Sequence, residues 1–359
     1  MLAFLLLSTF VIWGMFAATG LWWWVCFPLL GRFSPAGWIP VLGTALILAG
    51  ITLTRTHYNV FTTVLYYVAY LLFGFVFIAF CITALSAGLF FLLKLLGITA
   101  RVYLGSLSVG ISLVLFACGV WGGFKTPPIK HVVVNSSALP ALKIALISDT
   151  HLGMGVSYAR WHKALSRLEK EKPDILLVLG DIFEYGPHAD QYAARLAAFQ
   201  TPLGTYGVLG NHEYYNDFQK SLDFYKKAHI TLLQNEAVSL PNGLQIAGLK
   251  DIKTVGLNAK DITDFLTRLD NNKPLILLSH TPLYAEEAAA YGTDLMLSGH
   301  THNGQIWPFG YLVKGQFPRV YGLFKVAEMS FYITSGMFYW GIPLRLFSPA
   351  ELPILEVRP

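Results

Sequence analysis

Two histidines, His300 and His302, follow a glycine at the end of an apolar run in Leu297-Ser-Gly-His-Thr-His-Asn-Gly-Gln305. Imidazoles placed one residue apart on a loop can face the same point, and imidazole is a common metal ligand. The pair by itself is a weak indication, because a His-x-His more often lies on a surface strand or caps a loop. Its meaning depends on the other polar clusters of the chain.

Four further apolar runs lead through a Gly or Ser into side chains that can bind metals or move protons. Residues 143–148 precede Asp149 and His151, 174–179 precede Asp181 and Glu184, 206–209 precede Asn211 and His212, and 274–279 precede His280. Continuous apolar runs of this length are typical of strands buried on both faces. Because open α/β sheets collect ligands at the carboxyl ends of their strands, we expect all five clusters to converge at one edge.

The order of these clusters resembles the calcineurin-like metallophosphoesterase superfamily. Asp-x-His, Gly-Asp-x-x-Glu, Gly-Asn-His-Glu, an isolated His and Gly-His-x-His follow one another between residues 143 and 357. The resemblance implies a two-sheet α/β sandwich with helices outside both sheets and a metal site at the strand ends. The last motif is more similar to the membrane-associated bacterial branch than to the eukaryotic protein phosphatases.

The resemblance also implies a ligand set for two divalent metal ions. Asp181 matches the bridging carboxylate; Asp149, His151 and His302 match the ligands of one ion, and Asn211, His280 and His300 those of the other. Oxygen and imidazole ligands suit Mn, Fe or Zn, and the sequence does not choose among them.

His212 matches a family position that contacts the substrate and does not bind metal. There it would stabilise charge on the phosphoryl oxygens or protonate the leaving oxygen. Glu184 stands where the family usually carries Asp, and we expect it to orient His212. The alternative is that His212 and Glu184 form an ordinary loop hydrogen bond.

The resemblance implies a phosphatase or phosphodiesterase that acts by in-line attack of metal-bound hydroxide. The apolar N-terminal segments make a lipid-linked phosphate ester the favoured substrate. The alternative is a non-catalytic sensor or scaffold whose metal domain binds a phosphorylated ligand. A transporter is disfavoured because the apolar segments contain no Asp or Glu. The expected partners are membrane lipids and no nucleic acid, and the oligomeric state is left open.

The composition indicates a membrane part, since 54% of the 359 residues are hydrophobic. We predict a transmembrane region over residues 1–124 with helices at about 2–30, 38–54, 60–93 and 102–124, a linker over 125–142 and a metallophosphoesterase domain over 143–359. Residues 1–125 contain five basic residues and no acidic ones, which leaves 21 basic and 21 acidic residues in the remainder. A neutral soluble half has no basic stripe for nucleic acid.

Four spans would place the N-terminus, the Arg55 loop and the soluble domain on the same side of the membrane. Basic residues flank both sides almost equally, so the positive-inside rule hardly decides between them. We expect a multi-pass protein of the cell inner membrane with a cytoplasmic soluble domain. Arg55 and His57 are expected to anchor the topology, with headgroup binding as the alternative.

In the soluble half we predict helices at 158–170, 190–199 and 216–228, and a second sheet from 244–251, 274–279, 294–298, 330–335 and 352–357. The aromatic residues within 305–313, 321–324 and 337–340 have two interpretations: core packing, or a lip that meets the bilayer with Lys314, Arg319 and Arg345 near headgroups. His131, His162 and His188 are expected to have no role in the site.

Overall fold

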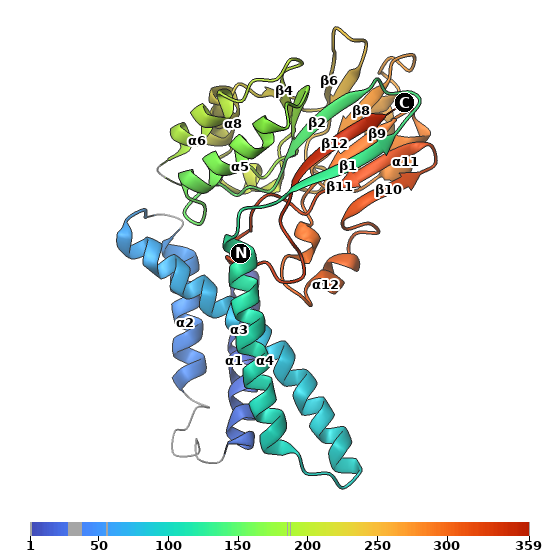
Figure 1. Cartoon of the computed structure of the whole chain (residues 1–359). Coiled ribbons are helices and arrows are strands. Elements are labelled where there is room, and N and C mark those ends of the chain that lie inside the picture. The colour runs from blue at the N-terminus through green and yellow to red at the C-terminus, as the bar shows by residue number, and fades with distance from the viewer. Residues whose placement is uncertain (1, 28–37, 55–56, 185, 187, 359) are drawn as a thin grey trace. The chain divides into compact units, whose positions relative to one another are not determined.

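The computed structural model describes residues 2–27, 38–54, 57–184, 186 and 188–358. It divides into two compact units (Figure 1). The helical unit comprises Met1–Phe124 together with Gly341–Leu346, and the sandwich unit comprises Lys125–Trp340 together with Phe347–Pro359.

The described part of the helical unit contains apolar helices; the predicted end of the first one, at residues 28–30, lies outside the described residues. They are α1 (Leu2–Cys26), α2 (Trp38–Leu53), α3 (Val60–Leu95) and α4 (Arg101–Phe124). Among the described residues, three stretches are long and apolar enough to cross a membrane: Leu6–Cys26, Val60–Leu95 and Arg101–Phe124. The 16 residues of α2 are fewer than the roughly 20 that a span needs, so its crossing stays a prediction.

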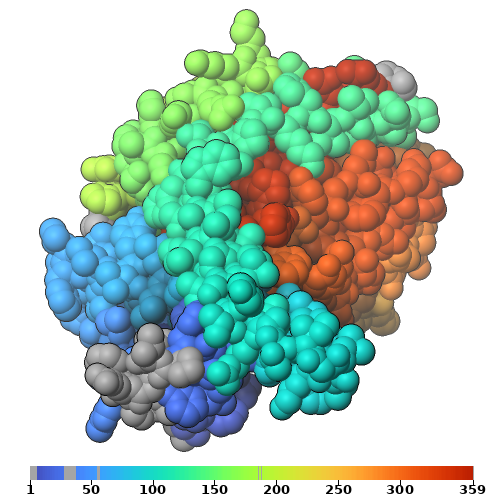
Figure 2. Space-filling model, turned by 60° about the horizontal axis from the view of Figure 1, so that its bottom comes forward, coloured from blue at the N-terminus to red at the C-terminus, as the bar shows by residue number. Residues whose placement is uncertain are grey.

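Small residues let these helices approach closely. A Cβ added to Gly50 of α2 would lie 2.2 Å from the Cβ of Ala69 in α3. The first turn of α3 is fixed by Asn59, whose side chain accepts the Thr62 N–H at 2.9 Å. Figure 2 shows the surfaces of α1, α3 and α4 against one another. This packing by glycine and alanine is typical of helices in membranes.

In the described part of the sandwich unit, the strands form two six-stranded sheets. The first sheet has the order β1 (Ile129–Asn135), β12 (Leu352–Arg358), β2 (Leu142–Ile147), β3 (Ile175–Val178), β4 (Thr205–Gly207) and β5 (Thr231–Leu232). The second sheet has the order β10 (Gly322–Val326), β11 (Met329–Ile333), β9 (Leu295–Ser298), β8 (Leu275–Leu278), β7 (Gln245–Gly248) and β6 (Glu236–Ser239). The strands that lead into the polar loops, β2 to β4 and β8 to β9, run parallel within their sheets.

The apolar strands are covered on both faces, because alternate side chains point to opposite sides. In β2, Ile144 and Leu146 join a core shared with Leu278 and Leu297 of the second sheet. The alternate residues of β2 pack on the outer helices α5 (Tyr158–Lys170), α6 (Ala189–Ala197) and α8 (Phe218–Lys227). The outer face of the second sheet packs on α10 (Ala259–Leu266) and α11 (Ala285–Ala290). The predicted two-sheet sandwich with outer helices is therefore confirmed.

One strand prediction was wrong, and one strand was not predicted. Residues 352–357, predicted for the second sheet, form β12 of the first sheet, parallel to β1 and antiparallel to β2. Within the predicted linker 125–142, Ile129–Asn135 forms β1, an edge strand that exists because β12 pairs with it. An apolar strand pattern indicates burial but does not say which neighbour will supply its hydrogen bonds.

Candidate metal centre

The polar loops predicted to form one site follow strands of both sheets. β2, β3 and β4 lead to Asp149, Asp181 and Asn211, whereas β8 and β9 lead to His280 and His300. Side chains from the two sets lie within hydrogen-bonding distance, as shown by the 3.2 Å between Asn211 Oδ1 and His280 Nε2. The site therefore lies where strand ends of two sheets meet, and not at the edge of one sheet as expected.

The first group contains Asp149, His151 and His302, all of them buried. His151 Nε2 lies 3.0 Å from His302 Nε2, which in turn lies 3.4 Å from Asp149 Oδ1. The structure thus brings together the residues predicted to bind the first ion.

The second group contains Asn211, His280 and His300. His300 Nδ1 lies 2.8 Å from Asn211 Oδ1 and 3.2 Å from His280 Nε2. His280 is fully buried, and Asn211 is 7% exposed. These are the residues predicted to bind the second ion.

Asp181 lies between the two groups. Its Oδ2 is 3.2 Å from His280 Nε2 and 3.9 Å from His151 Nε2. Its Oδ1 accepts the backbone N–H of His212 at 2.9 Å, which holds the carboxylate in place. A carboxylate in this position can contact ions in both groups.

Atoms with lone pairs face one another in both groups. The Nδ1 of His280 lies 2.6 Å from the Leu179 carbonyl oxygen, so its Nε2 faces the oxygens of Asn211 and Asp181. Lone pairs repel unless a proton or a cation lies between them. Ligand atoms about 2.1 Å from one ion and at right angles to each other are about 3 Å apart, as these imidazole nitrogens are. The clustered Asp and His residues fit a dinuclear metal site.

Glu184 contacts two imidazoles. Its Oε1 lies 2.8 Å from His151 Nδ1 and 3.1 Å from His212 Nδ1. The sequence predicted the second contact only. Because Glu184 binds the Nδ1 atom of both imidazoles, the Nε2 of His151 faces the two ligand groups. The Nε2 of His212 is left for another partner. The position of His212 close to His151 and Asp181 also allows it to serve as a ligand on geometry alone.

The carboxylates control the protonation of His212. Burial lowers the pKa of His212, but Asp181 and Glu184 outweigh this effect and raise the pKa to about 9. Burial raises the pKa of Glu184, and the imidazoles of His151 and His212 hold it below its ordinary value. An imidazolium–carboxylate pair is thus the favoured state of His212 and Glu184 at neutral pH.

A second pair crosses between the sheets. Burial raises the pKa of Asp181, but His280 and His212 hold it well below its ordinary value. Burial lowers the pKa of His280, but the carboxylate of Asp181 holds it well above its ordinary value. Burial and the neighbouring His280 lower the pKa of His300 to about 4. One imidazole of the second group is therefore neutral, as a metal ligand must be.

The loops that carry these side chains have strained backbones. Residues other than glycine rarely adopt positive φ, and such residues cluster at functional sites. The predicted ligands with positive φ are Asp149 (52°), His151 (43°), Asp181 (52°), His300 (70°) and His302 (48°). A positive φ at a non-glycine residue costs free energy, so it persists only where contacts with the surrounding structure stabilise it.

Two motif glycines allow the loops to approach the carboxylates. A Cβ on Gly299 would lie 2.4 Å from Asp149 Oδ2, and one on Gly210 would lie 2.2 Å from Asp181 Oδ1. Both distances are shorter than van der Waals contact, so a larger residue would displace the carboxylate. The glycines of these motifs are therefore required by packing.

Glu213 is a site residue to which the sequence analysis assigned no role. Its buried carboxylate accepts backbone N–H groups of Asp181 (2.9 Å), Ile182 (2.7 Å) and Gly210 (2.8 Å). It therefore ties the Asp181 loop to the start of α7 (Asn211–Tyr215). Its place in Gly210-Asn-His-Glu213 was the available signal, but the function of a buried carboxylate depends on amides from other loops.

Some aromatic residues after the last motif are buried, as expected for core packing, and others are exposed, as a lip that meets the bilayer would be. Phe317, Phe338 and Tyr339 are buried, whereas Tyr311 of α12 (Gly310–Lys314) and Trp340 are 67% and 50% exposed. Among the basic residues expected near headgroups, Arg319 pairs with Glu286 at 2.8 Å and Lys314 lies over the Tyr311 ring. Arg345 is 3% exposed, and its place near headgroups stays a prediction.

Two exposed aromatic rings stand beside His212. The ring of Tyr215, 67% exposed, lies 5.8 Å from the imidazole, and the ring of Trp340 lies 5.5 Å from it at 71°. Since both rings remain accessible, they form an apolar border on this side of His212.

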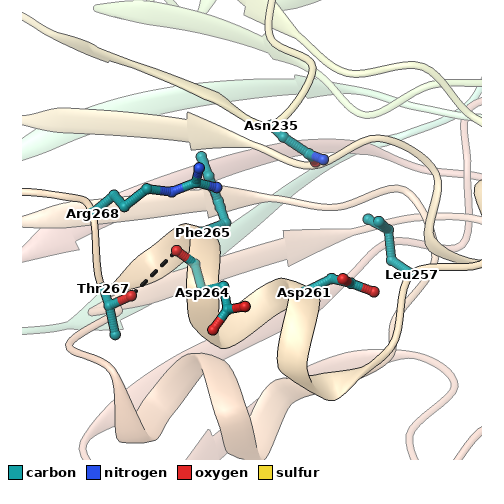
Figure 3. A pocket seen from close by; sticks show the side chains of 7 residues that line it. All are labelled: Asn235, Leu257, Asp261, Asp264, Phe265, Thr267 and Arg268. Carbon is teal, nitrogen blue, oxygen red and sulfur yellow. Dashed lines mark hydrogen bonds between the residues drawn. The ribbon is translucent and has the colours of Figure 1, made fainter.

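The histidines expected to lie outside the site have other partners. His162 Nδ1 accepts from Arg195 at 3.1 Å, His131 lies near Glu356, and the ring of His188 lies against Tyr192. A separate surface hollow of about 420 Å³ lies along α10 (Figure 3). Among the described residues its lining contains none of the predicted site, and comprises Asn235, Leu257, Asp261, Asp264, Phe265, Thr267 and Arg268.

Comparisons with known proteins identify the family of the chain. The family model described as calcineurin-like phosphoesterase matches residues 142–304. The chain is 35% identical over 254 residues to an uncharacterised metallophosphoesterase of Campylobacter jejuni, covering 69% of this chain and 68% of that one. It is 37% identical over 239 residues to an uncharacterised metallophosphoesterase of Aquifex aeolicus, covering 64% of this chain and 91% of that one. It is 33% identical over 278 residues to a transmembrane protein with metallophosphoesterase domain of Bos taurus, covering 71% and 63%.

Proposed function

Since the chain belongs to the calcineurin-like metallophosphoesterases, we propose that it is a membrane-anchored enzyme that hydrolyses phosphate esters with two bound divalent cations. The observation that carries the proposal is the position of Asp181, whose Oδ2 faces His280 and His151 of two separate ligand groups. The two cations of a phosphoryl clamp lie about 3.5–4 Å apart, a separation that one shared carboxylate can span.

Each ligand group would hold one cation. Asp149, His151 and His302 would bind the first, Asn211, His280 and His300 the second, and Asp181 both. When bound, the cations would neutralise the phosphate and supply a nucleophilic hydroxide from water at neutral pH. Mn, Fe and Zn all accept this mixture of oxygen and imidazole donors.

His212 would complete the reaction from the side of the leaving group. The hydroxide would attack phosphorus as the bond from phosphorus to the leaving oxygen breaks, and the imidazolium of His212 would give its Nε2 proton to that oxygen. Glu184 holds His212 Nδ1 at 3.1 Å and stabilises the positive charge before transfer. Because the pKa of His212 is raised to about 9, its imidazole is protonated at neutral pH and can act as the general acid.

The proposed substrate is a membrane-proximal phosphate ester, with a lipid-linked one favoured. The proposal is supported by the long apolar helices, which would keep the site near a bilayer, and by the exposed rings of Tyr215 and Trp340 next to His212. We place the sandwich unit on the cytoplasmic side of a cell inner membrane. Activity of a periplasm-specific reporter fused to the C-terminus would contradict that orientation.

The function is tested with detergent-purified full-length protein. We expect Mn²⁺-dependent hydrolysis of p-nitrophenyl phosphate or its bis-ester, and the faster of the two defines monoester or diester preference. Asp181→Asn should lack this turnover. Absence of turnover from wild-type protein with two ions bound would contradict general phosphoesterase activity and favour a sensor that binds a phosphorylated ligand.

A further inference from the structure

The loop after β7 lies beside the second ligand group, although no motif of the sequence includes it. Asp251 in this loop is fully buried and precedes the short helix α9 (Ile252–Val255). Its Oδ1 accepts the hydroxyl of Thr281, the residue after His280, at 2.5 Å. Its Oδ2 accepts the backbone N–H of Thr254 at 3.0 Å. The position of α9 is therefore fixed relative to the loop that carries a predicted metal ligand.

Lys253, an exposed residue of α9, lies near His300 of the same ligand group. Its Nζ lies 4.4 Å from the centre of the Phe317 ring and 3.4 Å from Gln316 Oε1. The Phe317 ring is 4% exposed, and its centre lies 5.3 Å from that of the His300 ring. The sum of these two ring distances is the upper limit of the separation between the ammonium and the His300 imidazole.

The electrostatics of His300 agree with this proximity. Burial and the neighbouring His280 lower the pKa of His300 to about 4, and the ammonium of Lys253 adds to that shift. His212 lies elsewhere in the centre, because its ring is 4.8 Å from that of His151 in the first ligand group. The proposed acid and Lys253 therefore border different ligand groups.

The charge of Lys253 has no carboxylate partner among the residues that the structure describes. Its ammonium contacts an amide oxygen and an aromatic face, and with three N–H donors it can bind an anion as well. Other exposed lysines of the sandwich unit pair with Asp or Glu instead: Lys220, Lys227, Lys260, Lys273 and Lys325. Lys253 therefore offers an uncompensated positive charge beside the second ligand group.

We propose that Lys253 forms an anion subsite beside the second ligand group, and that the favoured substrate places a second phosphate there. Lysine binds phosphate as a point charge on a flexible stem. Phe317 and Gln316 hold its ammonium on the His300 side of the centre. The substrate class is therefore a diphosphate ester, or another ester with two neighbouring phosphates. The proposal rests on the proposed hydrolase function and narrows its substrate.

The subsite is tested with two anions that are not hydrolysed. Inorganic phosphate has one phosphorus atom, and imidodiphosphate has two that are joined through nitrogen. Calorimetry with the full-length, detergent-purified protein in excess Mn²⁺ gives both dissociation constants. We expect Lys253→Gln to reduce the preference for imidodiphosphate over phosphate about tenfold, because a charge-assisted hydrogen bond is lost. An unchanged preference would overturn the proposal.

Two further variants control for the charge and the side chain. Lys253→Gln removes the charge but keeps most of the apolar stem, so Lys253→Arg, which keeps the charge, should retain most of the preference. Lys227→Gln removes the same charge from an exposed pair with Asp190 and should behave as wild type. An equal loss of preference in Lys227→Gln would show a general effect of net charge and overturn the subsite.

Ionic strength provides a second test, because salt screens the charge of an exposed ammonium. Between about 0.05 M and about 0.5 M NaCl, the preference of wild type for imidodiphosphate should fall more steeply than that of Lys253→Gln. Equal salt dependence in the two proteins would contradict a contact between Lys253 and the second phosphate.

Turnover separates failure of the subsite from failure of the proposed function. Imidodiphosphate should inhibit hydrolysis of p-nitrophenyl phosphate competitively, and Lys253→Gln should raise its inhibition constant about tenfold. Non-competitive inhibition would place the second phosphate outside the centre and overturn the subsite. Absence of wild-type turnover would contradict the hydrolase function, whereas a preference for imidodiphosphate that depends on Lys253 would still support the anion subsite.

Discussion

The two sheets of the sandwich contribute chemically different halves of the candidate centre. Loops after β2, β3 and β4 of the first sheet supply the oxygen donors and the proposed acid with its partner: Asp149, Asp181, Asn211, His212 and Glu184, together with the ligand His151. Among the described residues of the predicted site, loops of the second sheet supply imidazoles alone: His280, His300 and His302.

The two sheets therefore contribute differently to the charge of the centre. The first sheet carries the negative charge that would neutralise two cations, whereas the second sheet adds donors whose charge depends on pH. Neither half forms a ligand group without the other, since His302 lies 3.4 Å from Asp149 and His280 lies 3.2 Å from Asp181. Packing of the sheets therefore assembles the centre.

The largest effect should follow from losing the carboxylate shared by both groups. Asp181→Asn keeps the volume but removes the charge, so we expect both ions to be lost and turnover to fall to background. Metal content by mass spectrometry and turnover measure this. Asp190→Asn, at an exposed ion pair with Lys227, is the matched control. Retention of two ions by Asp181→Asn would contradict the bridging role.

A change in the second sheet should affect one ion. His280→Ala removes a donor that faces Asn211 and Asp181 but leaves Asp149, His151 and His302 in place. We expect about one ion per chain and a fall in kcat of at least about 100-fold, because a two-cation clamp is incomplete. Loss of both ions would mean that the two groups bind cooperatively and would weaken the division between sheets.

His212 belongs to the first sheet by position but should not be needed for metal. His212→Ala is expected to keep two ions and to lower kcat about 10²- to 10⁴-fold, since a general acid contributes this much. His162→Ala, outside the site, controls for loss of an imidazole. A metal-depleted His212→Ala protein would instead identify His212 as a ligand.

A substitution of Glu213 tests whether its buried carboxylate is needed to position the metal ligands of the first sheet. Glu213→Gln cannot accept all the backbone N–H groups of Asp181, Ile182 and Gly210. We expect metal affinity to fall about 10- to 100-fold, as when other residues that position ligands are changed. Competition with a metal buffer gives the affinity, and wild-type affinity in this variant would leave Glu213 a purely structural role.

The smallest effect concerns pH. Because the pKa of His212 is raised to about 9, the acid is protonated at neutral pH and loses its proton as pH rises through that value. Bound cations oppose this shift, so the alkaline fall in log kcat should begin no higher than about pH 9, with unit slope. The pH profile of His212→Ala should lack that limb; an unchanged limb would assign it to another group.

Much of the fold is local in origin and was predictable. Charge-free runs of sufficient length set the apolar helices, as α3 shows, predicted over 60–93 and observed as Val60–Leu95. Short apolar runs that end at glycine set the strands before each motif. The order of the motifs identified the residues that converge, because their spacing follows from strand and loop lengths.

What the sequence by itself determined is therefore the element types, the motif residues and the family. Only tertiary structure decided that β12 joins the first sheet, that Glu184 serves two imidazoles, and that Glu213 binds amides from two loops. It also decided that Gly341–Leu346, an ordinary loop by composition, packs with α3 and α4. Each of these facts depends on a partner far away in the chain, and local propensity and periodicity carry no information about that partner.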